Sequence, residues 1–182
     1  MVTTDPANTA SQLPLIGGVS ISTQCESQKK VQKTLDKLRQ LHDTLNAQLY
    51  ANPSQRPAIS SPSDAADLFK PFLAFLDHEE LWVAVLDTRN RLKTMVALYR
   101  GSVNSSQVRV AEVFKQAIIE NSPSIVIAHN HPSGDSSPSP DDLTITRSII
   151  MAGKLLDISL LDHIVISSNG FVSMKEKGLG FS

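Results

Sequence analysis

The chain has 182 residues, 41% of them hydrophobic, and a formal net charge of −1, values typical of a soluble protein with one domain-sized core. The near-neutral charge provides no global attraction to DNA or anionic membranes, and no apolar run approaches the roughly 20 residues that cross a bilayer. A single cysteine, Cys25, excludes an internal disulfide framework, and the first residues lack the apolar block of a signal peptide, so we expect a cytoplasmic protein.

The first 60 residues divide into three segments by composition. Residues 1–25 are small and polar without a sustained period, which predicts a disordered tail. Residues 26–50 carry leucines at three- and four-residue steps, which predicts an amphipathic helix. Residues 51–60 are rich in proline and serine and are interpreted as a linker.

The predicted helix at 26–50 has two interpretations. Its lysine-rich face would suit a nucleic acid or a protein partner, or it is simply the solvated side of an amphipathic helix. Interspersed acidic residues favour the second interpretation. A repeat at seven-residue spacing is compatible with a short coiled-coil contact in a homodimer: Val31, Leu38 and Leu45.

Residues 61–182 alternate between helical and extended patterns, which indicates an α/β domain. A first helix is expected after a Ser63–Asp64 cap, with an interruption near Pro71. The other predicted elements, in chain order, are a strand at 81–86, a turn at 88–91, a strand at 92–99, a helix at 110–120, a strand at 124–128, a helix at 140–155 and a hairpin formed by 158–166 and 171–174.

The run His129-Asn130-His131-Pro132 directly follows the buried strand predicted at 124–128. Residues two apart on an extended backbone share a face, so His129 and His131 can converge on one ion while Asn130 points away. Pro132 has no N–H to donate, so strand pairing is expected to end there. Two neighbouring histidines also occur by chance as ordinary core or surface residues.

The second half of the motif is Ser139-Pro140-Asp141-Asp142, a strong signal for the start of a helix. Asp142 would lie in the first turn, where the helix dipole favours the ionised carboxylate. The same four residues are also a sufficient helix cap without any metal. Combined with the two histidines, however, they supply three ligands for a transition metal that keeps one open position, as catalysis requires.

The residues from His129 to Gly134, followed by Ser139 and Asp142, resemble the JAMM motif of MPN/JAB-domain metalloproteases, and in detail the bacterial RadC family. The resemblance covers residues 61–182. It implies a three-layer α/β/α sandwich with a mixed sheet, of the cytidine-deaminase-like type. It also implies one zinc ion held by His129, His131 and Asp142.

The resemblance further implies amide hydrolysis of a peptide or isopeptide substrate. Zinc lowers the pKa of a bound water to about 7, and an upstream glutamate would accept its proton. Glu79 and Glu80 both lie where that base is expected; the family spacing favours Glu79. Ser139 would hydrogen-bond the oxyanion, unless its hydroxyl is occupied as the helix cap. Asp162 or His163 is compatible with a hydrogen bond to a ligand histidine or with a purely structural role.

Two other classes of function are weighed against a zinc amidase. One is a RadC-like binding module associated with DNA repair and without hydrolytic activity; residues 1–60 lack the helix-hairpin-helix pattern that would support DNA contact, and the charge does not favour it. The other is a nucleobase deaminase, which needs a Cys-x-x-Cys pair that this sequence does not contain. The physiological substrate does not follow from the sequence.

Overall fold

The computed structural model describes residues 26, 29–37, 39–41, 44, 55–101 and 108–181. The chain forms two compact units, Met1–Gln48 and Leu49–Ser182. In the first unit, every described residue is helical. The expected tail at 1–25 lies outside the described residues, as do two positions of the seven-residue repeat, so the proposed homodimer contact stays a prediction. Within the part of the chain that the structure describes, no helix has the length and apolar character of a membrane span.

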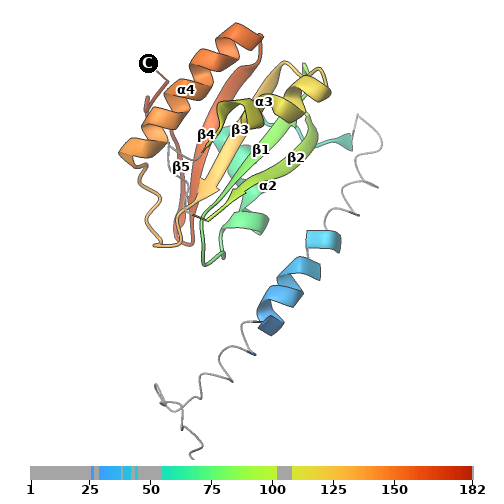
Figure 1. The fold of residues 1–182 in the computed structure, drawn as a ribbon, viewed down its shortest axis with the longest axis vertical. Helices are drawn as coiled ribbons and strands as arrows, with labels where there is room; N and C mark the ends of the chain where they lie inside the picture. Colours follow the sequence, from blue (N-terminus) through green and yellow to red (C-terminus); the bar gives the residue numbers. More distant parts are fainter. Residues whose placement is uncertain are drawn as a thin grey trace, which may run out of the picture. The chain divides into compact units, whose positions relative to one another are not determined.

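The second unit is built on one mixed sheet of five strands in the order β2-β1-β3-β4-β5 (Figure 1). The central strand β3 pairs antiparallel with β1 and parallel with β4, while β2 and β5 pair antiparallel at the two edges. The strands span Glu80–Leu86 (β1), Leu92–Arg100 (β2), Ser124–Asn130 (β3), Ser159–Ser167 (β4) and Gly170–Ser173 (β5).

Three helices cover the two faces of this sheet: α2 (Pro62–Leu73), α3 (Val110–Ile119) and α4 (Pro140–Leu156). Helix α2 packs on one face, against β3 and β4, and α3 and α4 lie together on the other face (Figure 1). Successive strand residues point to opposite faces, so the uniformly buried strands β1 and β3 contribute side chains to two separate hydrophobic cores, one on each face of the sheet. The α/β class with a mixed sheet and flanking helices, expected from the sequence, is confirmed.

Helix α2 begins earlier than the Ser63–Asp64 signal predicts. Its N-cap is Ser61, whose hydroxyl accepts the N–H of Asp64 at 3.2 Å, while the Asp64 carboxylate accepts the N–H of Ser61 at 2.9 Å. This reciprocal capping box, with Pro62 at the first helical position, fixes the helix start more strongly than Ser63 can. Pro71 lies inside the helix, which ends two residues later at Leu73.

Part of the linker expected at 51–60 instead belongs to the folded unit. The N–H of Ile59 donates to the carbonyl of Asn90 at 2.9 Å, and the N–H of Leu92 donates to the carbonyl of Pro57 at 2.9 Å. The Ile59 side chain is only 9% exposed and joins the core under α2. The linker interpretation was wrong for Pro57 and Ile59. A composition rich in proline and serine does not show that the one apolar side chain, Ile59, packs into the core under α2. Residues 51–54 lie outside the described residues.

Gly153 sets how closely α4 can approach the chain that leads into β4. A Cβ atom at this position would lie 2.4 Å from the carbonyl oxygen of Ile158 and 3.3 Å from the ring of Phe114. Gly153→Ala is therefore expected to lower the free energy of unfolding by about 1–3 kcal/mol, although alanine is the better helix former. Urea denaturation measures the change, with the exposed Met151→Ala as a control. A variant as stable as the parent would show that this close approach does not constrain α4.

Candidate metal centre

The central strand delivers both histidines of the motif to one end of the sheet. His129 lies on the α4 face with only 1% of its surface exposed, and Asn130 lies on the opposite face. The N–H of His131 still donates to the carbonyl of Ile166 at 2.8 Å, so His131 is held by the neighbouring strand. The chain leaves the sheet at Pro132, as expected from its missing N–H.

Asp142, in the first turn of α4, completes the cluster. The Nε2 atoms of His129 and His131 are 3.0 Å apart. The carboxylate of Asp142 places Oδ1 at 3.1 Å from Nε2 of His129 and Oδ2 at 3.6 Å from Nε2 of His131. One ligand atom from each of the three residues lies within 4.8 Å of the others, which is the separation expected of atoms that share a metal ion. The structure thus brings together the three ligands that the motif predicts.

Ser139 and Asp142 form a capping box at the start of α4. Oδ2 of Asp142 accepts hydrogen bonds from the N–H and from the hydroxyl of Ser139, both at 2.7 Å, while the N–H of Asp142 donates to the Ser139 oxygen at 3.1 Å. The cap therefore both orients the carboxylate and leaves Oδ1 facing His129. The hydroxyl proton of Ser139 is engaged by Asp142, which supports the cap interpretation; its oxyanion role stays a prediction.

Electrostatic interactions in the cluster favour an ionised carboxylate. Burial opposes ionisation of Asp142, but its interactions with the adjacent imidazoles of His129 and His131 outweigh this effect and hold the pKa of the carboxyl far below its usual range. In return, the contact with Asp142 raises the pKa of His131 despite partial burial. Clustered imidazoles around a buried anion suit a site for a divalent cation.

The outward nitrogen of each histidine is also engaged. Nδ1 of His131 lies 2.8 Å from the carbonyl oxygen of Asp135, and Nδ1 of His129 lies 2.8 Å from Nε2 of His163 on β4. His163 is 1% exposed, and its burial, with the neighbouring His129, lowers its pKa well below the ordinary value. Of the two alternatives that the sequence left open for His163, the structure shows the hydrogen bond to a ligand histidine.

The two candidate glutamates differ in their surroundings. Glu80 is 3% exposed, and its carboxylate accepts the indole N–H of Trp82 at 2.9 Å and lies 2.9 Å from Nε2 of His78. Its N–H donates to the side chain of Asn130, the strand residue that points away from the metal centre. Glu79, by contrast, interacts with the cluster. The pKa of His131 is raised mainly by its contact with Asp142, and the negative charge of Glu79 adds to that effect. This electrostatic coupling favours Glu79 as the residue near the cluster.

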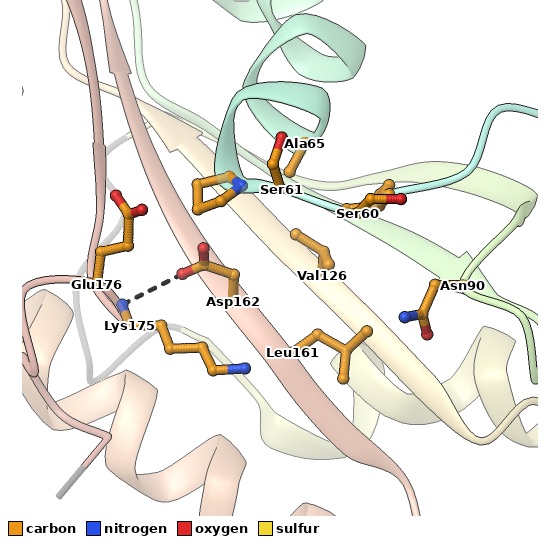
Figure 2. A pocket seen from close by; sticks show the side chains of 11 residues that line it. Ser60, Ser61, Ala65, Asn90, Val126, Leu161, Asp162, Lys175 and Glu176 are labelled. Atoms are coloured by element: carbon orange, nitrogen blue, oxygen red, sulfur yellow. Dashed lines mark hydrogen bonds between the residues drawn. The ribbon is translucent and has the colours of Figure 1, made fainter.

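Asp162 does not take part in the metal centre. It lies on the α2 side of β4, in a pocket that Lys175, Leu161 and Ser61 also line (Figure 2). Its carboxylate accepts the hydroxyl of Ser173 at 2.7 Å and the N–H groups of His163 and Lys175 at 2.7 and 3.2 Å. Burial raises the pKa of Asp162. These contacts give it a structural role, in fixing the backbone on both sides of the β4–β5 hairpin.

Sequence reasoning missed Thr146, which lies one helical turn after Asp142. Its hydroxyl donates to the carbonyl of Asp142 at 2.6 Å and lies 2.6 Å from Nδ1 of His163. The residue is fully buried. Helical periodicity could have identified it, because Thr146 lies on the same buried face of α4 as Ile145 and Ile149. Asp135, whose carbonyl meets His131, lies in an irregular loop and gave no such signal.

Comparisons with known proteins agree with this geometry. The profile of the family described as "RadC-like JAB domain" matches residues 59–179. A UPF0758 protein of Roseiflexus castenholzii is 52% identical over 133 residues, or 73% of this chain and 57% of that protein. Relatives of the same name from Chloroflexus aurantiacus and Shouchella clausii are 47% identical over 127 residues and 45% identical over 123 residues, covering 70% and 68% of this chain.

The chain spans little more than half the length of these relatives: 57%, 56% and 54% respectively. The matched part contains the sheet, all three helices that flank it and the complete histidine and aspartate cluster. On the strength of the profile match and of these relatives, the chain belongs to the family of RadC-like JAB-domain proteins.

Proposed function

We propose that this protein is a JAMM-type hydrolase that holds one zinc ion with His129, His131 and Asp142 and cleaves a peptide or isopeptide amide. The observation that carries the proposal is the convergence of two imidazole nitrogens and one carboxylate oxygen within 4.8 Å at the end of the fully buried central strand. Three protein ligands leave a vertex for water or substrate, the arrangement typical of catalytic zinc sites.

The donor chemistry of the cluster fits zinc. A carbonyl oxygen only accepts, so Nδ1 of His131 carries the proton toward Asp135, and Nε2 of the neutral ring keeps its lone pair for the metal. Oδ2 of Asp142 already accepts two hydrogen bonds from Ser139, which makes Oδ1 the oxygen offered to the ion. Two neutral imidazoles and one carboxylate leave a net positive charge on bound zinc.

Bound zinc would supply Lewis acidity, lowering the pKa of a water to about 7 and polarising the amide carbonyl. The protein's own groups would do the rest. Glu79 would accept the proton of the attacking water and return it to the leaving amine. Ser139, the N-cap of α4, would hydrogen-bond the oxygen of the tetrahedral intermediate once its hydroxyl turns away from Asp142.

A peptide-library cleavage screen tests this proposal directly. The protein loaded with zinc should cleave a subset of peptides, lose cleavage after treatment with a chelator and regain it when zinc is restored. His129→Ala, carried through the same purification, controls for a contaminating protease. Cleavage that survives chelation would contradict the proposal. A salt-dependent shift of DNA that is indifferent to zinc, without any cleavage, would instead support a binding module.

A further inference from the structure

A line of buried hydrogen bonds starts at one metal ligand and ends at another. Nδ1 of His129 lies 2.8 Å from Nε2 of His163, and Nδ1 of His163 lies 2.6 Å from the hydroxyl of Thr146. That hydroxyl lies 2.6 Å from the backbone carbonyl of Asp142. The four residues are between 0% and 2% exposed, so each polar atom depends on its partner in the line rather than on solvent.

Which atom donates in each of these hydrogen bonds follows from the last group, the backbone carbonyl of Asp142. The carbonyl of Asp142 can only accept, and two oxygens 2.6 Å apart without a proton between them repel, so the hydroxyl of Thr146 donates to it. The sulfur of Met174, at 3.6 Å, is a weaker and more distant acceptor for the same proton. With its single proton committed, Thr146 must accept from Nδ1–H of His163.

The proton position on His163 in turn fixes the proton position on His129. The His163 ring is 1% exposed, and its two nitrogens contact the hydroxyl of Thr146 and the imidazole of His129, neither of which is an anion that would offset a second buried proton. The ring therefore carries one proton, and placing it on Nδ1 leaves Nε2 without one. Nε2 of His163 accordingly accepts the Nδ1–H of His129. A neutral His129 with its proton on Nδ1 presents a lone pair on Nε2, the atom that faces His131 and Asp142.

We propose that Thr146 and His163 are positioning residues that hold His129 in the one tautomer able to bind the metal. The tertiary packing provides the connection: α4 carries both Asp142 and Thr146, one turn apart, and β4 inserts His163 between Thr146 and His129. This inference rests on the metal site of the proposed function but not on its hydrolytic activity.

The matched pair Thr146→Val and Thr146→Ser tests the role of the hydroxyl. Valine keeps the branched shape that packs against Gly180 but ends the line, leaving the Nδ1–H of His163 without an acceptor. Serine keeps the hydroxyl and removes only a methyl group. Competition with a chromophoric chelator should show zinc affinity about 10- to 100-fold weaker in Thr146→Val, and close to the parent in Thr146→Ser.

A spectroscopic measurement separates this role from simple packing. In the zinc-loaded parent, long-range 1H–15N correlations of the imidazole rings should show the proton of both His129 and His163 on Nδ1. A His163 proton on Nε2 would overturn the proposal, and this measurement decides it even if Thr146→Val fails to fold. Equal zinc affinity in the valine and serine variants would also overturn it. Neither readout involves a substrate, so a protein that binds zinc as described but cleaves nothing refutes the hydrolase alone.

Discussion

Asp142→Ala is expected to abolish stable zinc binding. In the proposed centre this side chain is one of three ligands and carries the only negative charge among them, and its Oδ1 lies 3.1 Å from Nε2 of His129. Loss of a residue that merely supports a ligand typically costs 10- to 100-fold in metal affinity, so loss of the ligand itself should exceed about 100-fold, or about 2.7 kcal/mol. Elemental analysis after dialysis should find close to one zinc per parent chain and almost none in the variant.

The neighbouring Asp141→Ala provides the control for this experiment. Asp141 is exposed and precedes Asp142 in the same helical turn, so its replacement removes the same charge from the helix start while all three residues of the cluster stay in place. Zinc content should stay at the parent level. If both alanine variants keep their zinc, the ion is bound elsewhere and the proposed centre is wrong.

Glu79→Gln should retain zinc but lose most amide hydrolysis. Glutamine preserves the size of the side chain but cannot accept a proton from water, and general acid–base catalysis typically contributes a factor of 10² to 10⁴, or about 3–5 kcal/mol of barrier. Initial rates on a peptide identified by the library screen measure the loss, and zinc analysis of the same sample confirms that the metal is still bound.

Glu80→Gln is the matched control because it makes the same chemical change one residue away. The Glu80 carboxylate is buried, accepts the indole N–H of Trp82 on the opposite face of the sheet and contacts the partly exposed His78. We therefore expect a lower melting temperature with little change in rate for the properly folded protein. A fast Glu79→Gln enzyme, or a folded but inactive Glu80→Gln enzyme, would reverse the assignment of the base.

Much of the fold was predictable because it depends on local periodicity. Strands β1 and β3 are largely apolar runs bounded by turn residues, and both are buried along their whole length. Two predicted boundaries, the start of α2 and the end of the linker, were wrong because they depend on specific hydrogen bonds rather than on periodicity. The start of α2 is decided by a reciprocal pair of hydrogen bonds between Ser61 and Asp64. Pro57 and Ile59 are held by backbone hydrogen bonds to Leu92 and Asn90, where the chain enters β2.

The cluster of His129, His131 and Asp142 was equally predictable, since two short-range rules place its members. The two-residue period of a strand sets His129 and His131 on one face, and the Ser-Pro-Asp-Asp start of α4 brings Asp142 to the first turn with its carboxylate held by Ser139. Neither rule, however, shows that the strand and the helix meet. The packing of α4 against β4 provides that contact.

The amino-acid sequence by itself determined most of the elements, the family and the three residues proposed as metal ligands, because each is encoded within a few neighbouring residues. Only the tertiary structure decided which side chains support them. The parallel register of β3 and β4 pairs Ile127 with His163, which brings that ring 2.8 Å from His129, and the crossing of α4 places Thr146 behind it. Contacts between residues 17 and 34 positions apart depend on strand order and helix packing, which no local pattern of side chains specifies.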